Sequence, residues 1–235
     1  MKLTSLYEDN GRLIKTLYKT KQGYKIYLVD GESVRNLSSS AEEFGGVAIH
    51  PQFPDLIPKD EIWIDKDSSK NEIPILVDTA LYQLKQIVTG KSKDEAYKEA
   101  IRREKRERAK ADYAERGHRP SSHTLPRDIY IRLYRTLFDG TKVWLVNGEE
   151  VRNHTKTDFI EGGHDYVYDF IPDGEVWLED GLNAEELPYI LYHELVERKL
   201  MKEQKMDYDS AHDIASDREY KKRRKNAFNA NLVRI

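Results

Sequence analysis

Hydrophobic and polar positions follow the same order twice along the chain, which predicts two copies of one small folding unit. In the first copy an alternating segment at 24–29 leads into Asp-Gly, then a loop with two glycines, then a short apolar strand at 61–64. The second copy repeats this order with a segment at 142–146, Asn-Gly, a Gly-Gly loop and a strand at 175–178. Because Asp-Gly and Asn-Gly between β-prone segments are typical of hairpins, we expect a further short strand after each dipeptide.

Each copy ends in two segments with helical periodicity. We expect helices at about 72–89 and 93–116 in the first copy, and at about 184–204 and 208–226 in the second. Asp207 is the expected N-cap of the last helix, because its carboxylate can accept hydrogen bonds from the free N–H groups of the first turn. The predicted fold class is α+β, with two tandem homologous units that each have a small antiparallel sheet and two C-terminal helices.

Direct comparison of the two copies supports a duplication. Lys25–Asn36 aligns with Lys142–Asn153 without a gap, and a Glu-Ile-Trp or Glu-Val-Trp strand follows in each copy. Residues 1–12 precede the first copy and have no counterpart in the second. The segment between the copies is rich in turn and loop residues, which indicates a linker. The predicted organisation is an N-terminal degenerate repeat unit at 1–117, a linker at 118–127 and a C-terminal repeat unit at 128–235.

A group of His and Glu residues occurs in the second copy alone. His193 and Glu197 are four residues apart on a predicted helix, so their side chains project from one face and could hold a metal ion together. Glu194 lies about 100° round that helix, where a general base beside the metal would be. His212, on the following helix, would complete a His/Glu/His set with one position left for water, as catalytic zinc sites require. The additional candidate ligands are His164, which follows Gly-Gly, and Glu219.

The first copy provides an internal comparison for these residues. The positions aligned with His193, Glu194, Glu197, His212 and His164 carry Thr79, Ala80, Gln83, Tyr97 and Val47, in that order. Scaffold residues persist in both copies, such as Trp63 with Trp177 and Pro74 with Pro188. The joint loss of the five polar candidates predicts a site in the C-terminal unit and a degenerate copy in the N-terminal unit. Tyr166 and Tyr208 are both candidates for stabilising an oxyanion there.

On these residues the second copy resembles the zincin-like metallopeptidases, whose signature is His-Glu-x-x-His on a helix behind a small sheet. The likeness covers roughly residues 175–220, and Glu197 stands where that signature has its second His. A carboxylate in that place also suits harder cations than zinc. The unit is similar as well to an uncharacterised domain of bacterial and phage proteins with a Gly-Gly-His loop and a His-Glu-Leu-x-Glu helix. The zincin resemblance implies hydrolysis of a peptide or amide bond, with a peptide or protein as substrate.

Composition narrows the chemistry that such a site can use. The chain has 235 residues, 34 % of them charged, a net charge of −3 and no Cys, which excludes disulfides, Cys-ligated zinc and a thiol nucleophile. Glycine-rich phosphate-binding motifs and Gly-x-Ser-x-Gly are absent from the sequence, so neither a nucleotide cofactor nor a serine hydrolase is expected. Without an apolar run of about 18 residues or a secretory leader, we expect no membrane association and a cytoplasmic protein, in the host cytoplasm if phage-encoded.

Three functional hypotheses follow. The first is a metal-dependent hydrolase in which His193, Glu197 and His212 hold a divalent ion, zinc, and Glu194 takes a proton from the attacking water. The second is a non-enzymatic interaction or structural protein of phage or bacterial origin, in which the same residues form a polar network or a structural metal site. The third is nonspecific nucleic-acid binding through basic helices, above all through the run at Lys221–Lys225.

Overall fold

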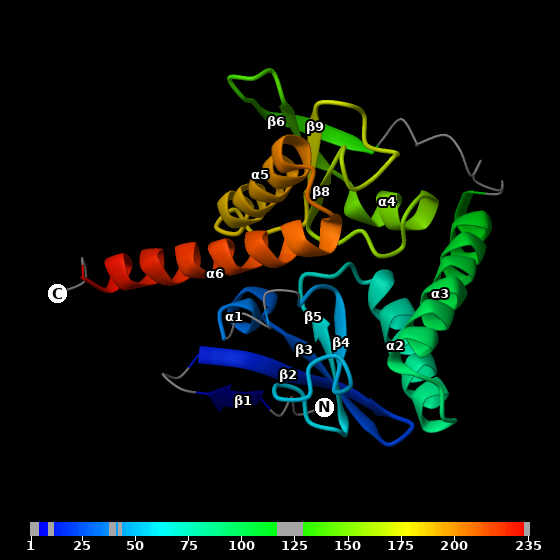
Figure 1. The fold of residues 1–235 in the computed structure, drawn as a ribbon. Helices are drawn as coiled ribbons and strands as arrows, with labels where there is room; N and C mark the ends of the chain where they lie inside the picture. The colour runs from blue at the N-terminus through cyan, green and yellow to red at the C-terminus, as the bar shows by residue number, and fades with distance from the viewer. Residues whose placement is uncertain (1–4, 9–11, 38–40, 42–43, 117–128, 233–235) are drawn as a thin grey trace. The chain divides into compact units, whose positions relative to one another are not determined.

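A computed structural model gives the fold of the chain and describes residues 5–8, 12–37, 41, 44–116 and 129–232 (Figure 1). The linker predicted at 118–127 lies outside the described residues. The chain divides into two compact units. The first consists of Met1–Arg35, Phe44–His123 and Arg152–Asp158. The second consists of Asn36–Glu43, Thr124–Val151 and Phe159–Ile235. Each contains a β-sheet followed in sequence by two long helices, so the predicted α+β class with two tandem units is confirmed.

The first copy contains a five-stranded sheet with the strand order β1-β2-β3-β5-β4. Its elements are β1 (Ser5–Glu8), β2 (Arg12–Lys21), β3 (Tyr24–Val29), α1 (Gly31–Arg35), β4 (Val47–Ile49), β5 (Glu61–Asp65), α2 (Glu72–Val88) and α3 (Lys93–Arg116). Strand β1 belongs to the lead-in segment that has no counterpart in the second copy, and it pairs with β2 in antiparallel orientation. The two helices begin and end within one residue of the predicted bounds.

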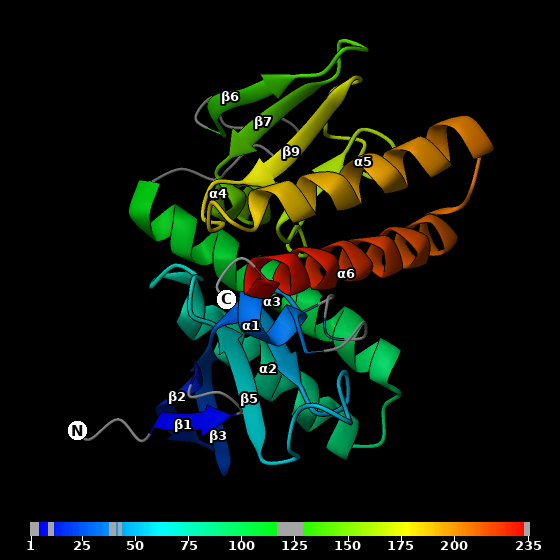
Figure 2. The ribbon, with the colours of Figure 1, turned by 90° about the vertical axis from the view of Figure 1, so that its left-hand side faces the viewer.

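The second copy contains a four-stranded sheet with the order β6-β7-β9-β8. Its elements are β6 (Tyr130–Thr136), β7 (Lys142–Val146), α4 (Gly148–His154), β8 (Gly162–His164), β9 (Glu175–Glu179), α5 (Leu187–Gln204) and α6 (Tyr208–Leu232). Helices α5 and α6 lie side by side and run in opposite directions (Figures 1 and 2). Asp207 caps α6 as predicted, because its Oδ1 accepts a hydrogen bond from the N–H of Ser210 at 3.0 Å.

The predicted hairpins at Asp-Gly and Asn-Gly are wrong, because each dipeptide begins a short helix. Asn147 accepts a hydrogen bond from the N–H of Glu150 at 3.1 Å, which is an N-cap, and Asp30 accepts a hydrogen bond at the matching helix start. A Cβ at Gly148 would collide with the carboxylate of Glu179, so this glycine serves a close approach. The helical crossover lets β9 join β7 in parallel, as β5 joins β3, and the sheets are mixed rather than wholly antiparallel.

The Gly-Gly-His segment is an edge strand, β8, and not the predicted loop. The register of the sheets pairs His164 with Val176, and Ile49 with Ile62. Because Val176 and Ile62 are matched positions, the counterpart of His164 is Ile49. The alignment of His164 with Val47 is therefore wrong, since it matched the two glycine pairs by identity instead of by strand register.

The backbone before each edge strand supports this register. Gly46 has a φ of 62° and Glu161 a φ of 61°, so both lie in the left-handed region. Each carbonyl accepts a hydrogen bond at 2.8 Å from the last residue of the neighbouring strand, Asp65 in one copy and Glu179 in the other. The position thus keeps its conformation in both copies, although only one of them has glycine there.

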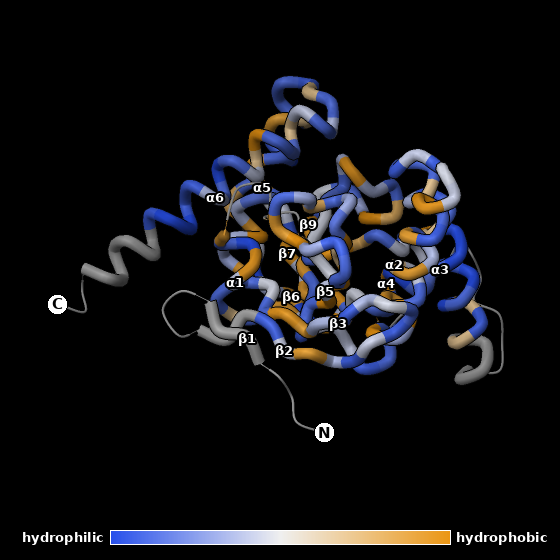
Figure 3. Tube along the Cα trace, turned by 90° about the horizontal axis from the view of Figure 1, so that it is seen from below, coloured by the Kyte–Doolittle hydropathy of each residue, from blue (hydrophilic) through white to orange (hydrophobic). Residues whose placement is uncertain are grey.

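The core of the second copy positions α5 over one face of its sheet. Apolar side chains of β7 and β9 pack against Leu187, Ile190 and Leu191 of α5. Residues of β7 and β9 are largely hydrophobic, whereas the part of α6 that is coloured in Figure 3 is mostly hydrophilic. Glu194 follows Ile190 by four residues and Leu191 by three, so it continues this side of α5 and meets β8 at Gly162. His193 lies on the side of α5 that faces α6, where it contacts Glu219. Of the described helices, none is both long and apolar enough to cross a membrane.

Candidate metal centre in the C-terminal unit

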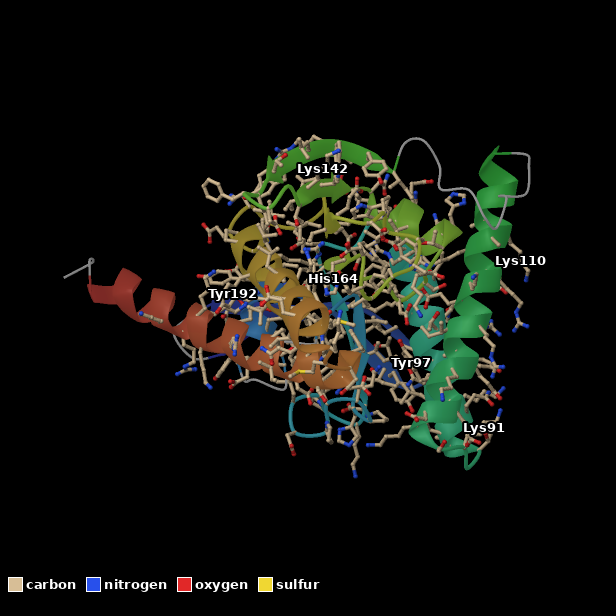
Figure 4. The ribbon with its side chains drawn as sticks, turned by 45° about the horizontal axis from the view of Figure 1, so that its top comes forward. Lys91, Tyr97, Lys110, Lys142, His164 and Tyr192 are labelled. Carbon is tan, nitrogen blue, oxygen red and sulfur yellow. The ribbon has the colours of Figure 1, made fainter. Side chains whose placement is uncertain are left out.

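All six residues that the sequence singled out as ligands or general base lie together. Helix α5 supplies three of them, α6 two and β8 one: His193, Glu194, Glu197, His212, Glu219 and His164. All except His212 are buried, and His164 is fully inaccessible to solvent. In Figure 4 His164 lies beside α5 in the interior of the unit. Five of the six have no equivalent residue type at the matched position of the first copy, and Glu219 is the exception.

Glu197 is at the centre of this cluster. Its Oε2 lies 2.8 Å from His212 Nδ1 and 3.5 Å from His193 Nε2. The two histidine nitrogens are themselves 3.1 Å apart, and the rings meet edge to face. On the other side, Oε1 of Glu197 lies 3.0 Å from His164 Nε2. The carboxylate of Glu197 is therefore shared among three imidazoles.

The three atoms His193 Nε2, Glu197 Oε2 and His212 Nδ1 fit one face of a tetrahedral metal site. Zinc with bonds of about 2.05 Å separates neighbouring ligand atoms by about 3.3 Å. The observed separations of 2.8, 3.1 and 3.5 Å are distributed around that value. A fourth ligand position is left for water, so the donor set and its spacing suit a divalent ion.

His164 is oriented by the backbone of its own segment. Its Nδ1 accepts a hydrogen bond from the N–H of Tyr166 at 3.1 Å, so the neutral ring carries its proton on Nε2. That nitrogen faces Oε1 of Glu197, although it makes no well-aligned hydrogen bond to any described residue. This tautomer turns the Nε2 proton toward Glu197 and leaves no lone pair on Nε2 for a metal ion.

Glu219 contacts Nδ1 of His193, which is not one of the three candidate ligand atoms. Its Oε2 lies 3.1 Å from Nδ1 of His193, and its Oε1 accepts a hydrogen bond from Nε of Arg223 at 2.8 Å. With Nδ1 of His193 engaged in this way, Nε2 is the nitrogen that remains for a metal.

Glu194 occupies space that the missing side chain of Gly162 provides. A Cβ at Gly162 would lie 2.9 Å from Oε1 of Glu194, which is closer than real Cβ contacts. In the first copy the matched positions are Val47 and Ala80, so a large side chain on the strand faces a small one on the helix. The exchange of small and large residues between the copies shows that β8 is adapted to a carboxylate on α5.

The cluster shifts the acid–base properties of its members in opposite directions. Burial opposes a charge on His193, but contacts with Glu197 and Glu219 outweigh it and raise the pKa of His193 to about 10. Burial likewise opposes a charge on Glu197, yet three histidine contacts hold its pKa well below the ordinary range. Burial raises the pKa of Glu194 to about 8, with the His193 charge opposing and the Glu197 charge adding to the shift. Glu194 is thus poised between its two protonation states near neutral pH.

Solvent reaches the cluster from the side of His212. The side chain of His212 is 28 % exposed, and the ring of Tyr208 stacks on it with centroids 5.3 Å apart. Tyr166 is also exposed and lies beside His164, with ring centroids 6.4 Å apart. Both oxyanion candidates therefore lie next to the cluster, and their position does not separate them.

A cavity of about 480 Å³ adjoins the residues that follow His164 and Glu197 in sequence. The residues lining it include Asp139, Thr141, Asp165, Tyr166, Arg198 and Lys202. Sequence reasoning missed Asp165 and Arg198, although each directly follows a candidate site residue. In the first copy their matched positions carry His50 and Leu84, so the comparison that identified the histidines would have identified this pair too.

The basic run of α6 is partly used in internal contacts. Arg223 is buried between two carboxylates, and Lys221 pairs with Asp217 at 2.5 Å. Lys222 lies 3.9 Å from the centroid of the ring of Tyr192, a residue of α5. Nucleic-acid binding stays a prediction that rests on fewer cations than the sequence alone implied.

No family model, curated protein or solved structure matches this chain. A functional interpretation therefore depends on the geometry of the cluster and on the comparison of the two copies.

Proposed function

We propose that the C-terminal unit binds one divalent metal ion, zinc, through His193, Glu197 and His212, and hydrolyses a peptide or amide bond. The observation that carries this proposal is the spacing of the three candidate ligand atoms, which is close to that of one tetrahedral face. The nature of the bond to be cleaved follows the resemblance to zincin-like metallopeptidases.

Charge balance in the buried cluster also favours a divalent ion. The buried carboxylate of Glu197 contacts three imidazoles, and the buried carboxylate of Glu219 contacts the other nitrogen of His193. Buried negative charge is costly without a nearby cation, and a divalent ion bound to neutral histidines would supply one beside Glu197.

Glu194 is the residue proposed to move the proton. When bound, zinc would supply a Lewis acid that polarises the substrate carbonyl and lowers the pKa of water. Glu194 would take a proton as the water oxygen bonds to the carbonyl carbon, and would pass it to the amine nitrogen as the C–N bond breaks. Tyr208 or Tyr166 would donate a hydrogen bond to the oxyanion that forms.

Metal analysis of the full chain, purified without chelator and without a His-tag column, tests the metal site. We expect close to one zinc ion per chain in the wild type, a loss in His193→Ala, and no change in Thr79→Ala at the matched position of the first copy. A metal content well below one ion per chain that His193→Ala leaves unchanged would contradict the proposal.

Assay of peptide and amide hydrolysis separates the enzymatic reading from a structural metal. We expect turnover in the zinc-loaded wild type that Glu194→Gln abolishes while zinc content is retained. Zinc that raises the unfolding temperature without any turnover would instead favour the non-enzymatic hypothesis.

A further inference from the structure

A buried chain of charged residues continues outward from His193. Arg223 donates hydrogen bonds from Nη1 and Nη2 to the two carboxylate oxygens of Glu186, at 2.5 and 3.1 Å. It also donates from Nε to Oε1 of Glu219 at 2.8 Å, and the other oxygen of Glu219 contacts Nδ1 of His193. The three charged residues are at most 4 % exposed, so water does not compete for these contacts.

This arrangement restricts both the position and the tautomer of His193. Glu219 can move little, because Arg223 holds it and is itself held by both oxygens of Glu186. An ionised carboxylate only accepts hydrogen bonds, so the group that it contacts on His193 must be Nδ1–H. Nε2 is directed at Glu197 and His212, so its lone pair would point at the proposed ion once the ion has displaced the Nε2 proton.

The first copy contains the same charged triad without the histidine. Arg108 of α3 donates from Nε to Oε1 of Glu104 at 2.9 Å and from Nη1 to Oε1 of Glu72 at 2.8 Å. Position 79, which matches His193, is a threonine. The triad therefore has a role in the fold that both copies share, and in the second copy it has gained a contact with a candidate ligand.

We propose that Glu219, held by Arg223 and Glu186, is a positioning residue that orients His193 for the metal. The inference rests on the proposed function, since it assigns a role relative to the same ion. Glu219 is close to the three candidate ligand atoms, but its carboxylate is turned toward Nδ1 of His193. Partners of this kind, which hydrogen bond to a ligand, are worth about 10–100-fold in metal affinity.

The two copies supply a matched pair of variants for the test. Glu219→Gln and Glu104→Gln each remove one charge from an equivalent triad, so they should lower the unfolding temperature by similar amounts. Zinc affinity, measured by competition with a chromophoric chelator, should fall about 10–100-fold in Glu219→Gln, recover in part in Glu219→Asp, and stay unchanged in Glu104→Gln. Equal zinc affinity in Glu219→Gln and Glu104→Gln would overturn the proposal.

Side-chain ¹⁵N spectra of the metal-free protein distinguish this proposal from the metal site itself. We expect a hydrogen-bonded Nδ1 proton on His193 whose signal shifts in Glu219→Gln and not in Glu104→Gln. If the wild type binds no zinc but this shift occurs, the proposed function fails and the orientation of His193 by Glu219 stands. If zinc binds normally and the signal does not respond to Glu219→Gln, the positioning role is refuted and the metal site is not.

Discussion

Arg198 on α5 binds the carboxylate of Asp165 with two parallel hydrogen bonds, Nε to Oδ1 at 2.7 Å and Nη2 to Oδ2 at 3.0 Å. Asp165 directly follows His164, and Arg198 directly follows Glu197. This ion pair therefore fixes the end of β8 against α5, next to the 3.0 Å contact between His164 and Glu197. Burial would raise the pKa of Asp165, but the Arg198 hydrogen bonds outweigh it and hold the pKa below its ordinary value. A bidentate pair of this kind constrains direction as well as distance.

Removal of Arg198 should destabilise the C-terminal unit strongly. Arg198→Leu, which introduces the residue found at the matched position of the first copy, leaves the Asp165 carboxylate buried without its partner. We expect a loss of roughly 3 kcal/mol in the free energy of unfolding, measured by urea denaturation. The double variant with Asp165→Asn should lose less than Arg198→Leu alone, because no buried charge remains. A double variant that loses more would show that the ion pair is not the source of the effect.

The metal-free protein should become less stable as pH rises from about 6 to about 9. The folded pKa of His193 is about 10 against an ordinary 6.5, so its contribution is complete below 6.5 and is lost as pH rises through 10. Glu194, with a folded pKa of about 8 against 4.5, acts in the same direction, because its buried carboxyl favours the protonated form. Glu197 and Glu219 have lowered pKa values, so their contribution is lost only below about pH 4.5.

Zinc should reverse this pH dependence. The ion must displace the proton of His193, so its affinity should increase by up to tenfold per pH unit below the pKa of that group. Unfolding temperatures measured with zinc and with chelator should therefore diverge as pH rises from about 6 to about 9. Parallel curves under the two conditions would contradict both the metal site and the assignment of the proton to His193.

The fit between Gly162 and Glu194 predicts a variant that keeps the metal and loses activity. Gly162→Val introduces the residue of the first copy and displaces the Glu194 carboxylate from β8. We expect hydrolysis to fall at least about 100-fold, the usual contribution of a general base, with zinc content unchanged. Adding Glu194→Ala, which completes the pair found in the first copy, should restore stability but not turnover. Retention of full activity in Gly162→Val would remove Glu194 from the proposed mechanism.

The candidate site could be predicted from the sequence because its residues depend on helical spacing. His193 and Glu197 share a face by their separation of four, and the degenerate copy identified which polar residues were not required by the fold. The comparison of the two copies does not single out Arg223, because the matched position of the first copy is also an arginine, Arg108. By sequence Arg223 belongs to a basic run, but its presence in both copies indicates a structural role.

The local geometry of the strands was harder to predict. Asn-Gly is typical of both a hairpin turn and a helix start. Here the N-cap hydrogen bond of Asn147 and the close approach of Glu179 to Gly148 favour the helix start. The sequence at Gly162–His164 predicts a loop, because two glycines weaken a strand by propensity. Here both are required by packing, since Cβ atoms would meet the Glu194 carboxylate and the ring of Tyr168.

The first copy should accept a metal site if the matched ligands are restored. The triple variant Thr79→His, Gln83→Glu and Tyr97→His would place the three ligand types on α2 and α3 at the positions that hold them on α5 and α6. The charged triad that orients His193 in the second copy is already present there in Glu72, Arg108 and Glu104.

We expect the zinc content of this triple variant to rise from one to two ions per chain. The added ion should bind more weakly than the first, because Ile49 replaces His164 and cannot hold the new carboxylate in place. Addition of Glu104→Gln should weaken the new site further and leave the original site unchanged, which chelator competition can resolve as two separate affinities. A folded triple variant that still binds a single ion would show that the two copies differ in more than their ligands.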